Sequence, residues 1–162
     1  MILNSKLAIL GGEKSINKKF KPYNTIGQEE IDAVTEVMKT GVLSKFLGCW
    51  DDDFYGGPKV QEFARKCDDL FQVRHALSVN SWTSGLIAAV GAIGIEPGDE
   101  VIVSPWTMTA SVTAILNWNA IPVFADIEEK TFNIDIKSVE KNISKYTKAI
   151  MAIDMFGRSC DI

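Results

Sequence analysis

The stretch ALSVNSWTSGLIAA, residues 76–89, is the segment around which the rest of the chain is interpreted. It begins with an apolar run, Ala76 to Val79, passes through a polar turn, and ends in residues that favour a helix. The pattern predicts a strand, a tight turn and a helix. The first N–H groups of a helix have no partner within it, and the helix dipole places its positive end there, so this turn can hold a phosphate or another anion. An ordinary helix cap is the alternative, because Ser and Thr favour that position for stability alone.

The alternation of strand and helix continues after this turn. Three further apolar runs predict strands at residues 100–104, 120–125 and 148–153, and residues 108–118 and 136–143 predict helices between them. Continuous apolar strands that alternate with helices indicate an α/β fold with a mostly parallel sheet and helices on both faces. Ligands of such sheets bind beyond the carboxyl ends of the strands. The residues expected there are Asn80 to Ser84, Ser104 to Thr107, Asp126 and Asp154.

The N-terminal part shows less regular patterning. Residues 1–26 are expected to form an extended arm, and amphipathic helices are predicted at residues 27–39 and from Pro58 to about Gln72. The long loop between them, Val42 to Pro58, is of a length that is often functional. Its acidic run, Asp51 to Asp53, could suggest a metal, but a solvated turn is preferred because the spacing of a calcium loop is lacking.

Composition excludes several classes of protein. The 162 residues are 46% hydrophobic and 23% charged, as in an ordinary globular domain. The net charge of -4 comes without a basic run, which argues against a nucleic-acid partner or a polybasic membrane patch. No apolar stretch approaches the roughly 18 residues that span a bilayer, and no secretory signal is recognised, so a cytoplasmic protein is expected. Three scattered cysteines and one histidine support neither a zinc site nor a disulfide framework, so no metal is expected.

Eight short motifs follow one another along the chain: Leu7 to Gly12, Gly56 to Phe63, Val79 to Leu86, Pro97 to Ile102, Pro105 to Thr107, Ile121 to Ile127, Thr131 to Asp135 and Phe156 to Arg158. In order and spacing they resemble the N-terminal part of the DegT/StrS family of pyridoxal-phosphate-dependent sugar aminotransferases. The resemblance covers essentially the whole chain.

The resemblance implies the large-domain fold of the aspartate aminotransferase superfamily, PLP fold type I. Residues 1–26 would be an N-terminal arm and residues 27–162 the N-terminal part of that large domain, without its C-terminal half and the small domain. It also implies a homodimer with shared active sites. The implied reaction moves an amino group from an amino acid, glutamate or glutamine, to a keto-sugar, commonly nucleotide-linked, in amino-sugar and polysaccharide biosynthesis.

The implied cofactor is pyridoxal 5'-phosphate. The family's phosphate-binding turn falls on Ser81, Trp82, Thr83 and Ser84. Trp82 stands where glycine is usual, and an indole can hinder the close approach of a phosphate to the backbone. The aromatic residue that stacks on the cofactor ring falls on Trp106, for which core or interface packing is the alternative. Asp154 occupies a position where many members have a histidine, so no imidazole role is transferred to it.

The cofactor chemistry also requires a lysine that forms a Schiff base and an acidic partner for the pyridine nitrogen. In the family both lie C-terminal to the matched segment, so no catalytic residue is assigned, and the 162 residues are expected to be an inactive N-terminal piece. Two alternatives stay open. The chain could be a non-catalytic binding or partner module, or belong to a dehydratase or cyclitol aminotransferase of the same superfamily.

Overall fold

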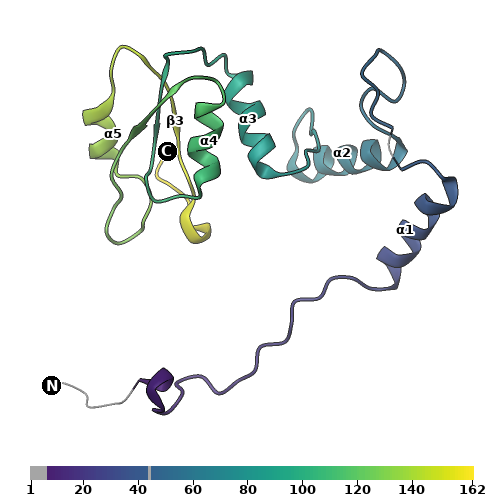
Figure 1. Cartoon of the computed structure of the whole chain (residues 1–162), viewed down its shortest axis with the longest axis horizontal. Coiled ribbons are helices and arrows are strands. Elements are labelled where there is room, and N and C mark those ends of the chain that lie inside the picture. Colours follow the sequence, from purple (N-terminus) through teal and green to yellow (C-terminus); the bar gives the residue numbers. More distant parts are fainter. Residues whose placement is uncertain (1–6, 44) are drawn as a thin grey trace. The chain divides into compact units, whose positions relative to one another are not determined.

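The computed structural model describes residues 7–43 and 45–162. The chain forms two compact units, Met1–Glu62 and Phe63–Ile162, and the boundary between them falls within helix α2 (Pro58–Phe71). The elements of each unit are coloured along the sequence in Figure 1. Ser44 and the first six residues of the predicted arm lie outside the described residues.

The first unit contains a short 3-10 helix, η1 (Ala8–Leu10), and helix α1 (Gln28–Thr40). The Glu30 carboxylate accepts the Gly27 N–H at 2.7 Å and so satisfies one of the free donors at the start of α1. Gly41 ends the helix in the left-handed conformation, with φ of 70°, and its N–H donates to the Met38 carbonyl. The prediction of a helix with an acidic start and a glycine end is confirmed.

The second unit is built on a three-stranded sheet. Its elements are α3 (Trp82–Ala92), β1 (Glu100–Val103), α4 (Thr109–Leu116), β2 (Ile121–Phe124), α5 (Ile136–Asn142), β3 (Thr147–Met151) and a 3-10 turn, η2 (Met155–Gly157). The strand order is β2-β1-β3, and both pairs are parallel. In Figure 1, α4 and α5 lie on opposite sides of the strands.

The core follows the alternation of side chains along β1. Val101 and Val103 belong to a cluster with residues of α3 and α4, while Ile102 faces the other way and packs with Val139 of α5. Both faces of the sheet are therefore covered by helices. This confirms the predicted α/β fold with a parallel sheet.

The predicted first strand, from Ala76 to Val79, is wrong. The segment carries no strand pairing, and its Leu77 side chain is 79% exposed. A strand exists only through backbone hydrogen bonds to a neighbour. The central strand β1 is already paired on both sides, and the segment joins neither β2 nor β3. The run is apolar, but in the described part of the chain it has no partner strand.

Helices α3 and α4 are joined by a close contact at Gly91. The Trp118 indole lies against this glycine so tightly that a Cβ there would be 2.0 Å from Trp118 Cζ2. The indole Nε1–H also donates to the Ile87 carbonyl at 2.8 Å. Trp118 follows the end of α4, and Gly91 lies near the end of α3, so the two helices run in the same direction. Since α4 starts where β1 ends, both helix N-termini lie at the carboxyl edge of the sheet.

This contact predicts the effect of one added methyl group. Gly91→Ala should lower the free energy of unfolding by up to about 2 kcal/mol, because overpacking costs about 1–3 kcal/mol and the better helix propensity of alanine offsets about 1 kcal/mol. Gly85→Ala in the same helix is the matched control. Its Cβ would meet the exposed Trp82 ring at 3.0 Å, and that ring is free to shift. Urea denaturation of both variants checks the difference, and equal stabilities would contradict the packing role of Gly91.

Candidate functional site

The turn before α3 presents free donors at the carboxyl edge of the sheet. Ser81 is the N-cap, and its Oγ accepts the Ser84 N–H at 3.2 Å. Ser84 Oγ in turn donates to Asn80 Oδ1 at 2.6 Å, which fixes the hydroxyl in the turn. The N–H groups of Trp82 and Thr83 have no acceptor in the described part of the chain. Together with the positive end of the helix dipole, these groups form a suitable seat for a phosphate.

The Trp82 side chain is 73% exposed and lies along the flank of α3. A Cβ built on Gly85, one turn further into the helix, would be 3.0 Å from Cε3 of this indole. The ring is therefore directed along the first helical turn. Whether it hinders a phosphate at the N-terminus stays a prediction from the sequence.

Trp106 follows the end of β1 and is held at a defined position in its turn. The buried Ser104 side chain accepts the Trp106 N–H at 3.0 Å. The indole itself is 50% exposed, and it packs against the Phe132 ring with the centroids 5.7 Å apart and the planes 32° from each other. Trp106 is thus no core residue within this chain. The indole is supported by Phe132 and remains half exposed.

Two phenylalanines extend this aromatic row and were not predicted as site residues. Phe132 lies between Trp106 and Phe156, whose ring centroid is 6.1 Å from that of Phe132 in an edge-to-face arrangement. We call Trp106, Phe132 and Phe156 the aromatic row. The signal available in the sequence was that all three belong to the motifs that follow strand ends, Pro105 to Thr107, Thr131 to Asp135 and Phe156 to Arg158.

The two acidic residues predicted at the strand ends serve local structure. Asp126 Oδ1 accepts the Ile127 N–H at 2.8 Å, and Asp154 Oδ1 accepts the Cys160 N–H at 2.9 Å. Burial raises the pKa of the Cys160 thiol, and the neighbouring Asp154 carboxylate raises this pKa further. Asp154 thus shapes the turn that follows β3, and it disfavours the thiolate of Cys160.

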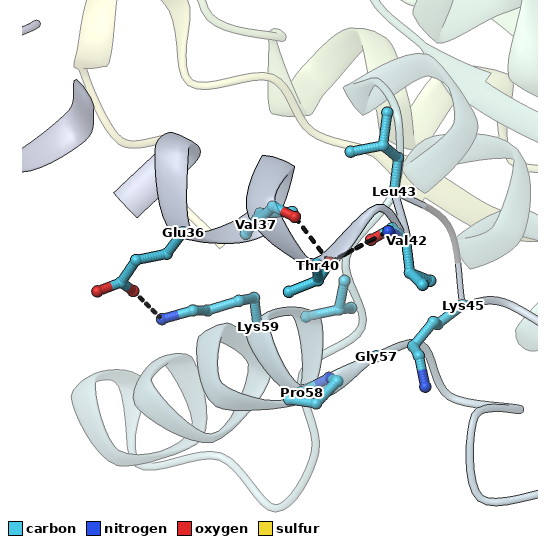
Figure 2. A pocket seen from close by; sticks show the side chains of 10 residues that line it. Glu36, Val37, Thr40, Val42, Leu43, Lys45, Gly57, Pro58 and Lys59 are labelled. Atoms are coloured by element: carbon cyan, nitrogen blue, oxygen red, sulfur yellow. Dashed lines mark hydrogen bonds and ion pairs between the residues drawn. The ribbon is translucent and has the colours of Figure 1, made fainter. Parts of the chain in front are cut away.

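The first unit contains a separate cavity of about 390 Å³, shown in Figure 2. It lies between the end of α1, the following loop and the start of α2, and none of the residues predicted to bind the cofactor lines it. Its walls include Val37, Val42, Leu43 and Val60. Lys59 lies at the cavity with its Nζ 3.8 Å from Glu36 Oε2. Part of the long loop predicted from the sequence therefore does line a cavity.

Neither a membrane-spanning helix nor a metal cluster is found in the described residues. Residues 7–43 and 45–162 contain no helix with the length and apolar character needed to cross a membrane. Among the same residues no three His, Cys, Asp or Glu side chains gather as a metal site would require.

The groups at the carboxyl edge of the sheet fit a phosphorylated aromatic ligand. The start of α3 offers exposed amides and hydroxyls for a phosphate, and Trp106 offers an indole supported by Phe132 and half exposed. Each belongs to a helix or strand end whose position is fixed by the buried core. The residues predicted from the sequence at these two places, Ser81 to Ser84 and Trp106, are therefore compatible with pyridoxal phosphate.

Comparison with known proteins supports the resemblance. The model of the DegT/DnrJ/EryC1/StrS aminotransferase family matches residues 24–162. A spore coat polysaccharide biosynthesis protein of Bacillus subtilis is 43% identical over 145 residues, which are 88% of this chain and 34% of the relative. A GDP-perosamine synthase of Vibrio cholerae is 40% identical over 106 residues, covering 65% of this chain and 29% of the relative.

A solved structure is similar to this chain as well. A Streptococcus pneumoniae protein assigned as a sugar aminotransferase, in its PLP-form, superposes with a TM-score of 0.75 at 32% identity, covering 90% of this chain and 34% of that one. The chain spans about a third of the length of the relatives that it matches. The resemblance and the partial aminotransferase fold predicted from the sequence are confirmed.

The Cys160 environment gives a test of the turn after β3. Asp154→Asn should lower the pKa of the Cys160 thiol, because it removes a negative charge that disfavours the thiolate while an amide oxygen can still accept the Cys160 N–H. Alkylation of Cys160 by iodoacetamide should then become fast at lower pH than in the parent protein. The rate is followed against pH by mass spectrometry, with Cys49 and Cys67 replaced by Ser. Asp161→Asn is the matched control, and equal profiles for the two variants would contradict the assignment.

Proposed function

Because this chain belongs to the DegT/DnrJ/EryC1/StrS aminotransferase family, we propose that the protein is a PLP-dependent aminotransferase that transfers an amino group from an amino acid to a keto-sugar. The observation that carries the proposal is the first turn of α3, where the free N–H groups of Trp82 and Thr83 lie beside the Ser81 and Ser84 hydroxyls. By the resemblance of the sequence motifs, this turn falls at the phosphate-binding position of the family.

The chain's own residues would bind and orient the cofactor. Ser81 and Thr83 would hold its phosphate through their hydroxyls and the free first-turn amides. Ser84, whose hydroxyl donates to Asn80 Oδ1, would exchange that hydrogen bond for one to the phosphate, and Trp106 would offer its indole to the pyridine ring. When bound, the cofactor supplies an electron sink that withdraws electrons from the substrate. A ring stacked on Trp106 is restrained in its tilt, which is the contribution that this residue would make. We assign no lysine of the chain to the covalent step.

The acceptor is proposed to be a nucleotide-linked keto-sugar. Two relatives support this substrate class: one is named for polysaccharide biosynthesis, and the other for the synthesis of a sugar linked to GDP. The amino donor is proposed to be glutamate or glutamine. We also propose that the whole protein is cytoplasmic, and that it is a homodimer with shared active sites, as the family resemblance implies.

A binding module is the second candidate, and the cavity in Figure 2 is the observation that favours it. Its apolar walls and its position beside the long loop would suit a ligand or partner without any chemistry at α3. Loss of cofactor binding on changes at α3 and Trp106 separates the two candidates, because none of these residues lines the cavity.

The indole of Trp106 should contribute to cofactor affinity. Trp106→Ala in the full-length protein is expected to weaken pyridoxal phosphate binding about two- to tenfold, since an aromatic pair contributes about 0.5–1.5 kcal/mol beyond buried area. Trp106→Phe should retain most of the affinity, because a ring remains. Cofactor titration followed by absorbance measures both. Trp118→Phe, at the α3–α4 contact, is the control. If Trp106→Ala has the same cofactor affinity as this control, the Trp106 indole is not the platform on which the cofactor ring stacks.

The 162 residues alone are expected to bind the cofactor weakly and to catalyse no transfer. A helix N-terminus contributes on the order of 1 kcal/mol to holding an anion at an exposed site, which cannot replace a covalent bond to a lysine. The purified 162-residue chain is mixed with pyridoxal phosphate and reduced with borohydride, and modified lysines are mapped by mass spectrometry beside an amino-transfer assay. The full-length protein is the positive control. One stoichiometrically labelled lysine together with turnover in the short chain would show that it is catalytically sufficient.

A further inference from the structure

Asn133 is a buried polar residue that ties two distant loops together. The residue is 5% exposed and lies in the connection between β2 and α5. The Nδ2 group donates to the carbonyls of Arg158 at 3.1 Å and Ser159 at 3.0 Å, and Oδ1 accepts the Met155 N–H at 3.1 Å. All of these partners lie in the segment after β3. One amide side chain therefore holds the whole turn from Met155 to Ser159.

The residue before Asn133 is the middle member of the aromatic row. Phe132 has φ of 61°, and Phe156 has φ of 55°, a region that bulky side chains rarely adopt. The backbone around Phe132 is fixed locally, because the Phe132 N–H donates to the Glu128 carbonyl and the Glu128 N–H donates to the Asn133 carbonyl, both at 2.9 Å. The Asn133 side chain is thus attached to the same short, hydrogen-bonded backbone segment that carries the Phe132 ring.

We propose that Asn133 is a positioning residue for the cofactor platform: by binding the turn Met155–Ser159 it holds Phe132 against Phe156 and so fixes the orientation of the Trp106 indole. The inference rests on the proposed function in that Trp106 is taken as the platform. Asn133 acts only through other residues, since its side chain is buried and bonds to backbone groups.

Ordinary core packing does not account for the arrangement. Within the 162 residues, Phe156 is 81% exposed and Trp106 is half exposed, so the aromatic row lies at the surface of this part of the protein. Rings at a surface gain little from burial, and the orientation of each ring is then set by its neighbours and by the backbone. The buried Asn133 amide supplies that restraint, since its Nδ2 donates two hydrogen bonds and its Oδ1 accepts one. Releasing the turn would leave these buried polar groups unpaired.

The test reads the Trp106 environment directly. The full-length protein is labelled with 5-fluorotryptophan, its fluorine NMR spectrum is recorded without cofactor, and Trp106→Phe identifies the Trp106 resonance. Asn133→Asp should shift this resonance, because a carboxylate cannot donate to the Arg158 and Ser159 carbonyls. Its affinity for pyridoxal phosphate should fall about two- to tenfold, and the loss should vanish when Trp106 is already Ala.

Asn142→Asp is the matched control. Asn142 Nδ2 also donates to two carbonyls, those of Phe124 and Ser138, but at the other end of α5. It should leave the Trp106 resonance and the cofactor affinity unchanged. Asn133→Ser, which shortens the side chain without adding charge, replaces Asn133→Asp if the latter fails to fold.

The outcomes separate the inference from the proposed function. An unchanged Trp106 resonance in the Asn133 variants would overturn the inference, and so would an equal shift in Asn142→Asp. If Trp106→Ala weakens cofactor binding while the Asn133 variants do not, only the inference fails. If Trp106→Ala binds the cofactor as tightly as the parent protein, Trp106 is not the platform for the cofactor ring, whatever the resonance shows, and that part of the proposed function is contradicted.

Discussion

The second unit depends on the burial of one short strand. Val101, Ile102 and Val103 of β1 are almost completely inaccessible to solvent, and β1 is hydrogen-bonded on both sides. Such a strand must be apolar on both faces, because each face packs on a helix layer. The positions of α3, α4 and α5 follow from this requirement. The Trp106 part of the candidate site also follows from it, since its turn begins where β1 ends. The turn at Ser81 is positioned instead by α3, which packs on the same core.

The parts of the fold that the sequence predicts are those with local causes. Helix α1 could be read from its acidic start and its terminal glycine, and α2 from a proline in the first turn and an apolar period. The strand expected before α3 failed because pairing is not a local property. An apolar run shows that a segment prefers burial, but the neighbour that would pair with it is set by the whole chain.

The candidate site likewise contains residues that the sequence predicts and residues that it does not. Ser81 could be recognised because a hydroxyl before a helix has a local function, and its contact with the Ser84 amide is of that kind. Phe132, Asn133 and Phe156 could not be found from periodicity, since they lie in connections and their contacts reach across more than twenty residues. Backbone conformations with positive φ at phenylalanine also run against residue preference, which is why such positions escape a reading of the sequence.

The left-handed backbone at Phe132 and Phe156 has a consequence for how this surface would respond to selection. A bulky residue in such a conformation carries a strain of about 1–3 kcal/mol. Asparagine or glycine adopts the same conformation with less strain. Selection for thermal tolerance alone would therefore favour losing these two rings, whereas selection for a well-oriented aromatic surface would keep them. At both positions, selection for stability and selection for function therefore favour different residues.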